Sequence, residues 1–178
     1  MTDRGAQRRR EQGVVQMRVE HMQPFVSAAA YVLKQELNVE VERGDLSLTE
    51  TDYTTKDVTV LIGVTGELEG TVLFGTTEEM AMNIVYEMTG ERKVFYDETC
   101  ESAIAELGNV ISGRAMALLE DQGIHCTISP PTVITGRGTI ISAVNMRRLI
   151  VPLHTRLGTL DIAISLRAKE KLQEVAVE

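Results

Sequence analysis

The hydrophobic pattern of this chain switches between helical spacing and strand alternation, which restricts it to folds that contain both helices and a sheet. Apolar residues recur at the helical spacing over residues 22–37, which predicts a helix with one buried face and with Pro24 in its first turn. Apolar and polar residues then alternate over residues 39–42 and 58–65, and both segments are predicted to be strands. A further strand is predicted after the turn at Gly66.

In the second part of the chain, helical patterns are again followed by strand patterns. Thr76 followed by Glu79 forms a capping box, which predicts the start of a short helix that ends at Gly90. A second long helix is predicted to begin near Asp97 and to end before Gly123. After it, short strands are predicted at about residues 124–128, 132–135, 139–144, 148–153 and 159–166. The chain is therefore expected to belong to the mixed α+β class.

Two short similarities within the chain suggest that the fold consists of two related halves. Residues 68–71 (LEGT) resemble residues 156–159 (RLGT), 88 positions later. Residues 25–28 (FVSA) resemble residues 110–113 (VISG), 85 positions later. Two similar offsets in the same order predict a duplicated unit made of a helix followed by strands.

Length and charge limit the organisation and the partners. A chain of 178 residues predicts a single domain, placed at residues 19–178, after a mobile basic arm at residues 1–18 in which Met17 is an alternative start. The net charge of -8 and the absence of Trp argue against a nucleic-acid partner. No apolar run has the length of a membrane span or the form of a signal peptide. We therefore expect a cytoplasmic protein that does not bind membranes.

The sequence contains none of the common catalytic or metal-binding motifs. Cys100 and Cys126 are expected to be free thiols, because two cysteines do not form the disulfide framework of small secreted domains. His21, His125 and His154 are far apart and belong to no zinc-binding pattern, so no metal site is expected. Glycine-rich phosphate loops and the nucleophile elbow of hydrolases do not occur in the sequence either. Any catalysis must use other residues.

One face of the second long helix carries polar residues. At 100° per residue, Ser102, Glu106, Asn109 and Gly113 fall within about 60° of one another and are predicted to point to solvent or to a partner. The opposite face is apolar and is expected to face the core. Its residues are Ile104, Leu107, Ile111, Ala115 and Leu118. Gly108 and Gly113 each cost about 1 kcal/mol relative to alanine within a helix, and a glycine at position 113 lets another backbone approach closely.

The segment at residues 102–113, SAIAELGNVISG, resembles the S/D-x-x-x-E-x-x-N active-site motif of the CheC, CheX and FliY family of phosphatases of phosphorylated CheY. Residues 62–70 (IGVTGELEG) and 129–137 (SPPTVITGR) are similar to the corresponding segments of the CheX branch. The resemblance spans roughly residues 19–168. It implies duplicated helix-plus-strands halves, with long helices packed on a mostly antiparallel sheet.

The resemblance implies a hydrolase of two-component signalling that removes the phosphoryl group from an aspartate of a CheY-like response regulator. Asn109 would then orient the attacking water, and Glu106 would pair with the active-site lysine of the receiver domain. Ser102 and Gly113 would contact the partner. The resemblance implies no cofactor bound by this chain itself, and it places Mg²⁺ in the receiver domain.

The number of motifs indicates the CheX branch, whose members form homodimers through sheet edges and carry one site in each subunit. An offset of 85 places His21 and Pro24 at the positions that Glu106 and Asn109 occupy in the second half. The first half is therefore predicted to carry no second site.

Two other functions remain open. A non-catalytic receiver-binding module, or one like the middle domain of flagellar switch proteins, would share the fold, but such switch domains typically lack the pair of Glu106 and Asn109. An unrelated enzyme acting on a small molecule has no candidate nucleophile, metal cluster or phosphate loop in its favour.

Overall fold

The structure is a computed structural model that describes residues 18–50, 52–143 and 146–169. The predicted arm lies outside the described residues except for Arg18, and so do Met17 and residues 170–178. The helices are α2 (Val19–Leu37), α3 (Glu78–Thr89) and α4 (Glu98–Asp121). The strands are β1 (Glu42–Arg43), β2 (Ser47–Thr49), β3 (Asp52–Thr54), β4 (Val58–Gly66), β5 (Leu68–Thr76), β6 (Cys126–Ile128), β7 (Thr132–Thr135), β8 (Ile140–Ser142), β9 (Arg148–Thr155) and β10 (Gly158–Ala168).

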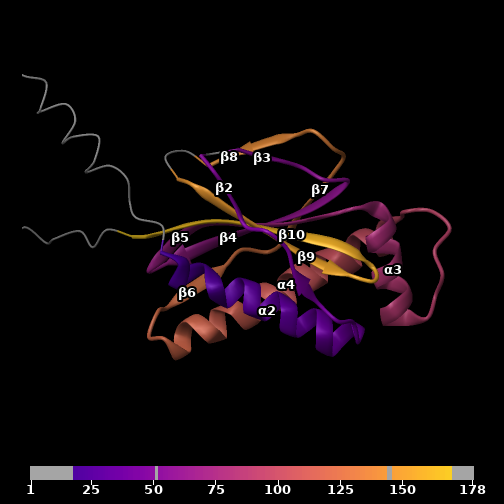
Figure 1. The fold of residues 1–178 in the computed structure, drawn as a ribbon, viewed down its shortest axis with the longest axis horizontal. Helices are drawn as coiled ribbons and strands as arrows, with labels where there is room; N and C mark the ends of the chain where they lie inside the picture. The colour runs from indigo at the N-terminus through magenta and orange to yellow at the C-terminus, as the bar shows by residue number, and fades with distance from the viewer. Residues whose placement is uncertain (1–17, 51, 144–145, 170–178) are drawn as a thin grey trace, which may run out of the picture.

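An antiparallel sheet forms the middle of the fold. Its strands follow the order β1-β9-β10-β5-β4-β6, with β2 also paired to β9 and β7 also paired to β4. The helices cover one face of this sheet, and the separate pair β3 and β8 lies over the other face (Figure 1). The predicted α+β class, with long helices packed on a mostly antiparallel sheet, is confirmed.

The strand order is symmetric about the centre of the sheet. The hairpins β4–β5 and β9–β10 lie side by side, and β5 pairs with β10 between them. The short strands are exchanged between the halves: β1 and β2 pair with β9, whereas β6 and β7 pair with β4. Each half therefore contains a long helix, short strands and a hairpin, in the order that the predicted duplication requires.

Two glycines at the predicted offset of 88 share an unusual backbone conformation. Gly70 and Gly158 have φ angles of 146° and 140°. A Cβ at Gly70 would overlap the backbone oxygen of Ser165, so only glycine fits this backbone position. The shared backbone conformation supports a duplicated origin of the two halves.

The burial of the two long helices does not fit the predicted offset of 85. That offset places the buried Phe25 and Ala29 of α2 at the positions of the exposed Val110 and Arg114 of α4. The burial patterns agree instead at offsets of 82 and 86, which differ by about one helical turn. The assignment of His21 and Pro24 as counterparts of Glu106 and Asn109 therefore does not fit the packing of the helices. Four-residue similarities are too short to set a helix register, which depends on which positions pack against the sheet.

The starts of two helices also differ from the prediction. Thr77, not Thr76, caps α3, and its hydroxyl accepts a hydrogen bond from the Met80 backbone N–H at 3.1 Å. Thr76 is buried at the end of β5 and donates to the Thr159 carbonyl, so it cannot serve as the cap. Helix α2 begins at Val19, which makes Pro24 its sixth residue rather than part of its first turn.

The strand predictions succeeded where the strands are long or bounded by turns. All five predicted strands after α4 are present as β6 to β10, and β4 and β5 occupy the predicted places. Residues 39–41 do not form a strand, although Val39 is buried. Strands β2 and β3 were not predicted, because most of their residues are exposed and show no apolar alternation.

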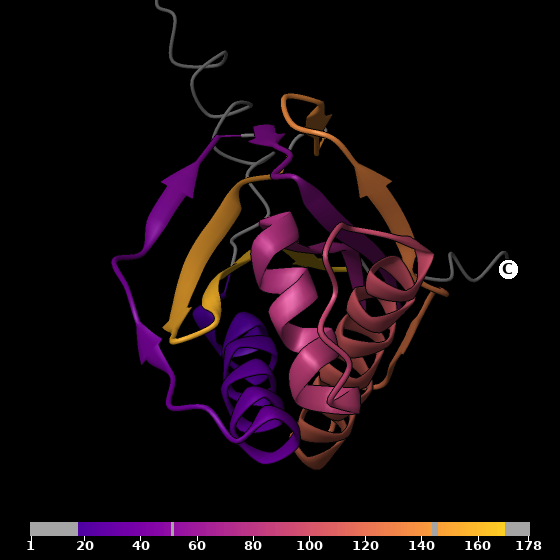
Figure 2. The same ribbon diagram turned by 90° about the vertical axis from the view of Figure 1, so that its right-hand side faces the viewer.

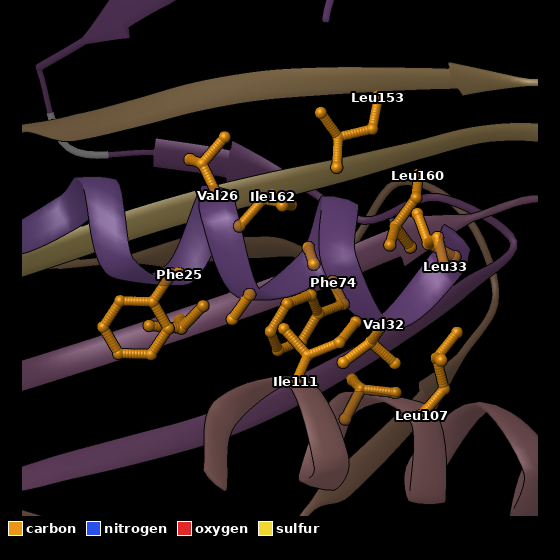
Figure 3. Close-up of a cluster of buried hydrophobic side chains, with 14 of the residues drawn as sticks. Phe25, Val26, Val32, Leu33, Phe74, Leu107, Ile111, Leu153, Leu160 and Ile162 are labelled. Atoms are coloured by element: carbon orange, nitrogen blue, oxygen red, sulfur yellow. The ribbon is translucent and has the colours of Figure 1, made fainter. Parts of the chain in front are cut away.

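The main core lies between the helices and the sheet. Side chains from α2, α4 and the sheet meet there, including Phe25, Leu33, Phe74 and Ile111 (Figure 3). Each of these four side chains is at most 1% exposed, so the packing of α2 and α4 leaves no solvent between them and the strands at these positions. This packing determines which face of α4 remains outside.

We expect Phe25→Ala and Leu33→Ala each to lower the free energy of unfolding by about 2 to 5 kcal/mol, because each deletes a fully buried side chain and leaves a cavity. Urea denaturation followed by circular dichroism measures this loss. Gln35→Ala, at an exposed position of the same helix, is the matched control. A loss below about 1 kcal/mol for both core variants would contradict the described packing.

Candidate active site on helix α4

Helix α4 begins at the predicted residue because Asp97 caps it. The carboxylate of Asp97 accepts hydrogen bonds from the backbone N–H groups of Thr99 at 3.0 Å and Cys100 at 3.1 Å. The backbone hydrogen bond from Cys100 and the contact with the Lys93 ammonium lower the pKa of Asp97. A cap formed by neighbouring residues sets the start of the helix locally, and the start determines which residues share a face.

The inward face of α4 matches the predicted apolar stripe. Ile104, Leu107, Ile111 and Ala115 are buried, whereas Leu118 at the edge of the stripe is half-buried. Gly108 is also buried, and a Cβ there would lie 3.0 Å from Val60 and 3.3 Å from Phe74 of the sheet. The glycine at position 108 therefore allows α4 to approach the sheet closely.

The four predicted site residues lie together on the outward face. Ser102, Glu106 and Gly113 are exposed, and Asn109 is half-buried. The stripe extends for about 16 Å along the axis at 1.5 Å per residue. Within the described part of the chain, the side chains of Ser102, Glu106 and Asn109 make no hydrogen bond or ion pair. Their polar groups are therefore available to a molecule outside this chain.

Gly113 differs from Gly108 in its surroundings. A Cβ at Gly113 would have nothing within 4 Å among the described residues, so packing inside the chain does not require a glycine there. The helix nevertheless loses about 1 kcal/mol relative to alanine at this position. A small residue on this stripe leaves room for a partner's backbone.

A contact between the two long helices lies beside the stripe. The guanidinium of Arg114 stacks 3.4 Å from the ring centre of Tyr31 on α2. Val110, the next residue after Asn109, is 38% exposed and adds an apolar group to the same surface. The sequence analysis missed the stack, since nothing in the local pattern connects two residues 83 positions apart.

The site is a surface and not a pocket. A shallow hollow of about 330 Å³ is lined by Glu40, Val41, Glu42, His154, Thr155 and Arg156, and it contains no residue of the stripe. In residues 18–169, leaving out positions 51, 144 and 145, no group of His, Cys, Asp or Glu is arranged to hold a metal ion. Over the same residues Cys100 and Cys126 are free thiols. None of the helices described has the length and apolar character needed to span a membrane.

The side chains of the stripe can do two things: they can orient a molecule by hydrogen bonding, and they can supply a negative charge. An asparagine amide can donate and accept hydrogen bonds without ionising, so it can hold a water molecule in one orientation. An exposed carboxylate can pair with a cation of a partner. The Ser102 hydroxyl makes no hydrogen bond to Glu106 or to another base among the described residues, as activation of a nucleophile would require.

Comparison with known proteins finds relatives in the family that the sequence motif resembles. The family described as chemotaxis phosphatase CheX matches residues 58–154. The CheY-P phosphatase CheX of Thermotoga maritima is 34% identical over 114 residues, which are 64% of this chain and 74% of that protein.

Solved structures share the fold over most of their length. A CheC-like superfamily protein from Shewanella is 28% identical with a TM-score of 0.78, covering 85% of this chain and all of that one. In the CheX-CheY-BeF3-Mg²⁺ complex from Borrelia burgdorferi, the matching chain is 30% identical with a TM-score of 0.71, covering 84% of this chain and 99% of that one. The fold expected from the sequence resemblance is therefore confirmed.

Proposed function

The chain belongs to the CheX family of chemotaxis phosphatases, and we propose that it hydrolyses the aspartyl phosphate of a CheY-like receiver domain with Glu106 and Asn109 of α4. The observation that carries the proposal is the exposed stripe on which both side chains lie without a partner in the described part of the chain. The activity would be cytoplasmic, like the response regulators on which it acts.

Hydrolysis of an aspartyl phosphate demands little covalent chemistry from the enzyme. The oxygen of a water molecule forms a bond to phosphorus while the bond from phosphorus to the aspartate oxygen breaks. The aspartate leaves as a stable carboxylate, and the water proton passes to the released phosphate. A side chain that places the water in line with the breaking bond is therefore sufficient, and we assign this role to Asn109.

Glu106 positions the enzyme on its substrate. Its exposed carboxylate is one helical turn before Asn109 and would pair with the active-site lysine of the receiver. We expect Mg²⁺ to be bound by the receiver domain, where it would neutralise charge on the phosphoryl oxygens. The exposed Ser102 and Gly113 would contact the receiver at the two ends of the stripe.

The other long helix supports one site for each chain. The motif E-x-x-N occurs in the sequence only at Glu106 and Asn109, and α2 contains no asparagine. The Gln23 amide, three residues after Glu20 on α2, donates instead to the Ser27 hydroxyl at 3.1 Å. We therefore propose that each chain binds one receiver domain.

The test is the rate of phosphate release from a phosphorylated CheY-like receiver with Mg²⁺, with and without the purified protein. An increase over spontaneous decay that is proportional to protein concentration supports the proposal. Binding of the activated receiver without such an increase would instead support the non-catalytic receiver-binding or switch-like module.

We also predict a homodimer formed through sheet edges. In the described residues, β2 pairs only with β9, and Leu48 of β2 is 53% exposed. An edge strand with an exposed apolar side chain favours pairing with a second chain. Light scattering at tens of micromolar protein should give twice the mass of the chain, and a monomer mass would refute this assembly without affecting the proposed catalysis.

A further inference from the structure

The loop at residues 91–97, which connects α3 to α4, is held in place at several points. The guanidinium of Arg92 lies 4.8 Å from the ring centre of Tyr86 on α3. The ammonium of Lys93 contacts Glu91 at 3.0 Å and Asp97 at 3.1 Å, and the Lys93 side chain is only 12% exposed. These contacts hold the loop on both sides of its middle.

A fourth contact anchors the end of the loop. Tyr96 packs against the main core, and its hydroxyl is buried. Asp97 caps α4, so the last residues of the loop have a defined conformation. Figure 2 shows this segment running outside the helices from α3 to the start of α4. Contacts with the rest of the chain therefore hold the whole loop in one position.

Two apolar side chains project from this anchored loop into solvent. Val94 is 90% exposed and Phe95 is 71% exposed, which are the two highest values among the large hydrophobic residues described. We refer to these two residues as the exposed pair. A phenylalanine can bury 150–250 Å² and is a frequent anchor of protein interfaces. Lys93 and Tyr96, on either side of the exposed pair, are held by their contacts with the rest of the chain. The exposed pair between them therefore faces outward.

The exposed pair is close to the Ser102 end of the stripe. Phe95 is two residues before Asp97, a separation of at most about 7 Å, and Ser102 is about 7.5 Å further along the helix axis. The Cα atoms of Phe95 and Ser102 are therefore within about 15 Å of each other. A standard interface covers about 800 Å² on each partner, which corresponds to a disc about 32 Å across. One receiver domain on the stripe can reach the exposed pair within such a footprint.

We propose that Val94 and Phe95 form a docking contact for the receiver domain and that this contact contributes to affinity, not to the chemical step. The inference rests on the proposed function, since the receiver that occupies the stripe is also the partner that covers the exposed pair. The contact is separate from the Glu106 and Asn109 motif and lies on a different element. It therefore affects which receivers are bound without changing how water is oriented.

Phe95→Ala is expected to raise the KM for the phosphorylated receiver about tenfold while kcat stays within twofold. The dissociation constant for the receiver domain with beryllofluoride and Mg²⁺, measured by calorimetric titration, should rise by the same factor. Phe95→Leu should restore most of the affinity, because it keeps an apolar side chain at this position. Ile140→Ala is the matched control, since Ile140 is 63% exposed on β8, on the opposite side of the sheet from α4.

The outcomes separate this inference from the proposed function. If the wild type neither accelerates phosphate release nor binds the activated receiver, both the proposed function and this inference are overturned. If it binds the activated receiver without accelerating release, only the proposed function is overturned, and the dissociation constant of Phe95→Ala alone tests the docking contact. If the wild type is active and Phe95→Ala leaves KM and the dissociation constant unchanged, only the docking contact is overturned. A fall in kcat at constant KM, or a change in the mass of Phe95→Ala by light scattering, would also overturn it, because the loop would then serve the chemistry or self-association.

Discussion

Asn109→Ala is expected to lower the rate of phosphate release from the phosphorylated receiver about 100-fold, because loss of the amide leaves the attacking water without a fixed orientation. The side chain is half-buried on the outward face of α4 and makes no hydrogen bond within the described residues. Its removal should therefore leave the helix and the core intact. Stopped-flow measurement of phosphate release under saturating receiver gives the change in kcat directly.

The control for this variant is Ser27→Ala, at an exposed polar position of the other long helix, α2. Ser27 is exposed, and its hydroxyl accepts a hydrogen bond from Gln23 at 3.1 Å. The substitution should leave kcat unchanged. Equal thermal unfolding of both variants and the wild type would show that the effect is local. A rate for Asn109→Ala within threefold of the wild type, in a folded protein, would remove Asn109 from the mechanism.

Glu106→Ala should weaken binding of the activated receiver by about 2 to 5 kcal/mol and lower turnover with it, because it removes one member of a charge pair across the interface and leaves the receiver lysine unpaired. Glu106→Lys should have a larger effect, since it places two positive charges together. Calorimetric titration with the receiver domain, beryllofluoride and Mg²⁺ measures the affinity, and the phosphate-release assay measures turnover.

Glu120→Ala is the matched control for the charge. Glu120 is exposed and belongs to the same face of α4, but it lies about 21 Å from Glu106 along the axis at 1.5 Å per residue. A general effect of net charge on association would appear in both variants, whereas a specific pair would appear only in Glu106→Ala. Unchanged affinity and turnover in Glu106→Ala would exclude the proposed pairing with lysine.

The faces of α4 could be predicted from the sequence because they depend on local properties. The cap at Asp97 and the 3.6-residue period determine together that Ser102, Glu106 and Asn109 point away from Ile104 and Ile111. A motif that lies within two helical turns needs no distant part of the chain to bring its members together. The three helices and the long strands were predictable for the same reason.

Other features depended on contacts between distant residues. The choice of Thr77 over Thr76 as the cap of α3 follows from the hydrogen bond of Thr76 to Thr159 in the neighbouring strand β10. The correspondence between α2 and α4 depends on which side chains the sheet buries, and a similarity of four residues does not report that. The stack of Arg114 on Tyr31 joins two helices across 83 residues.

The sequence by itself determined the class of the fold, the two faces of α4 and the candidate pair Glu106 and Asn109, because periodicity, capping and a short helical motif are local. Only the tertiary structure decided that β1 and β2 pair with β9 while β6 and β7 pair with β4. It also decided that Val94 and Phe95 remain exposed on an anchored loop. Short strands and loops carry too few buried residues to show a pattern, and long-range packing alone determines their partners and their exposure.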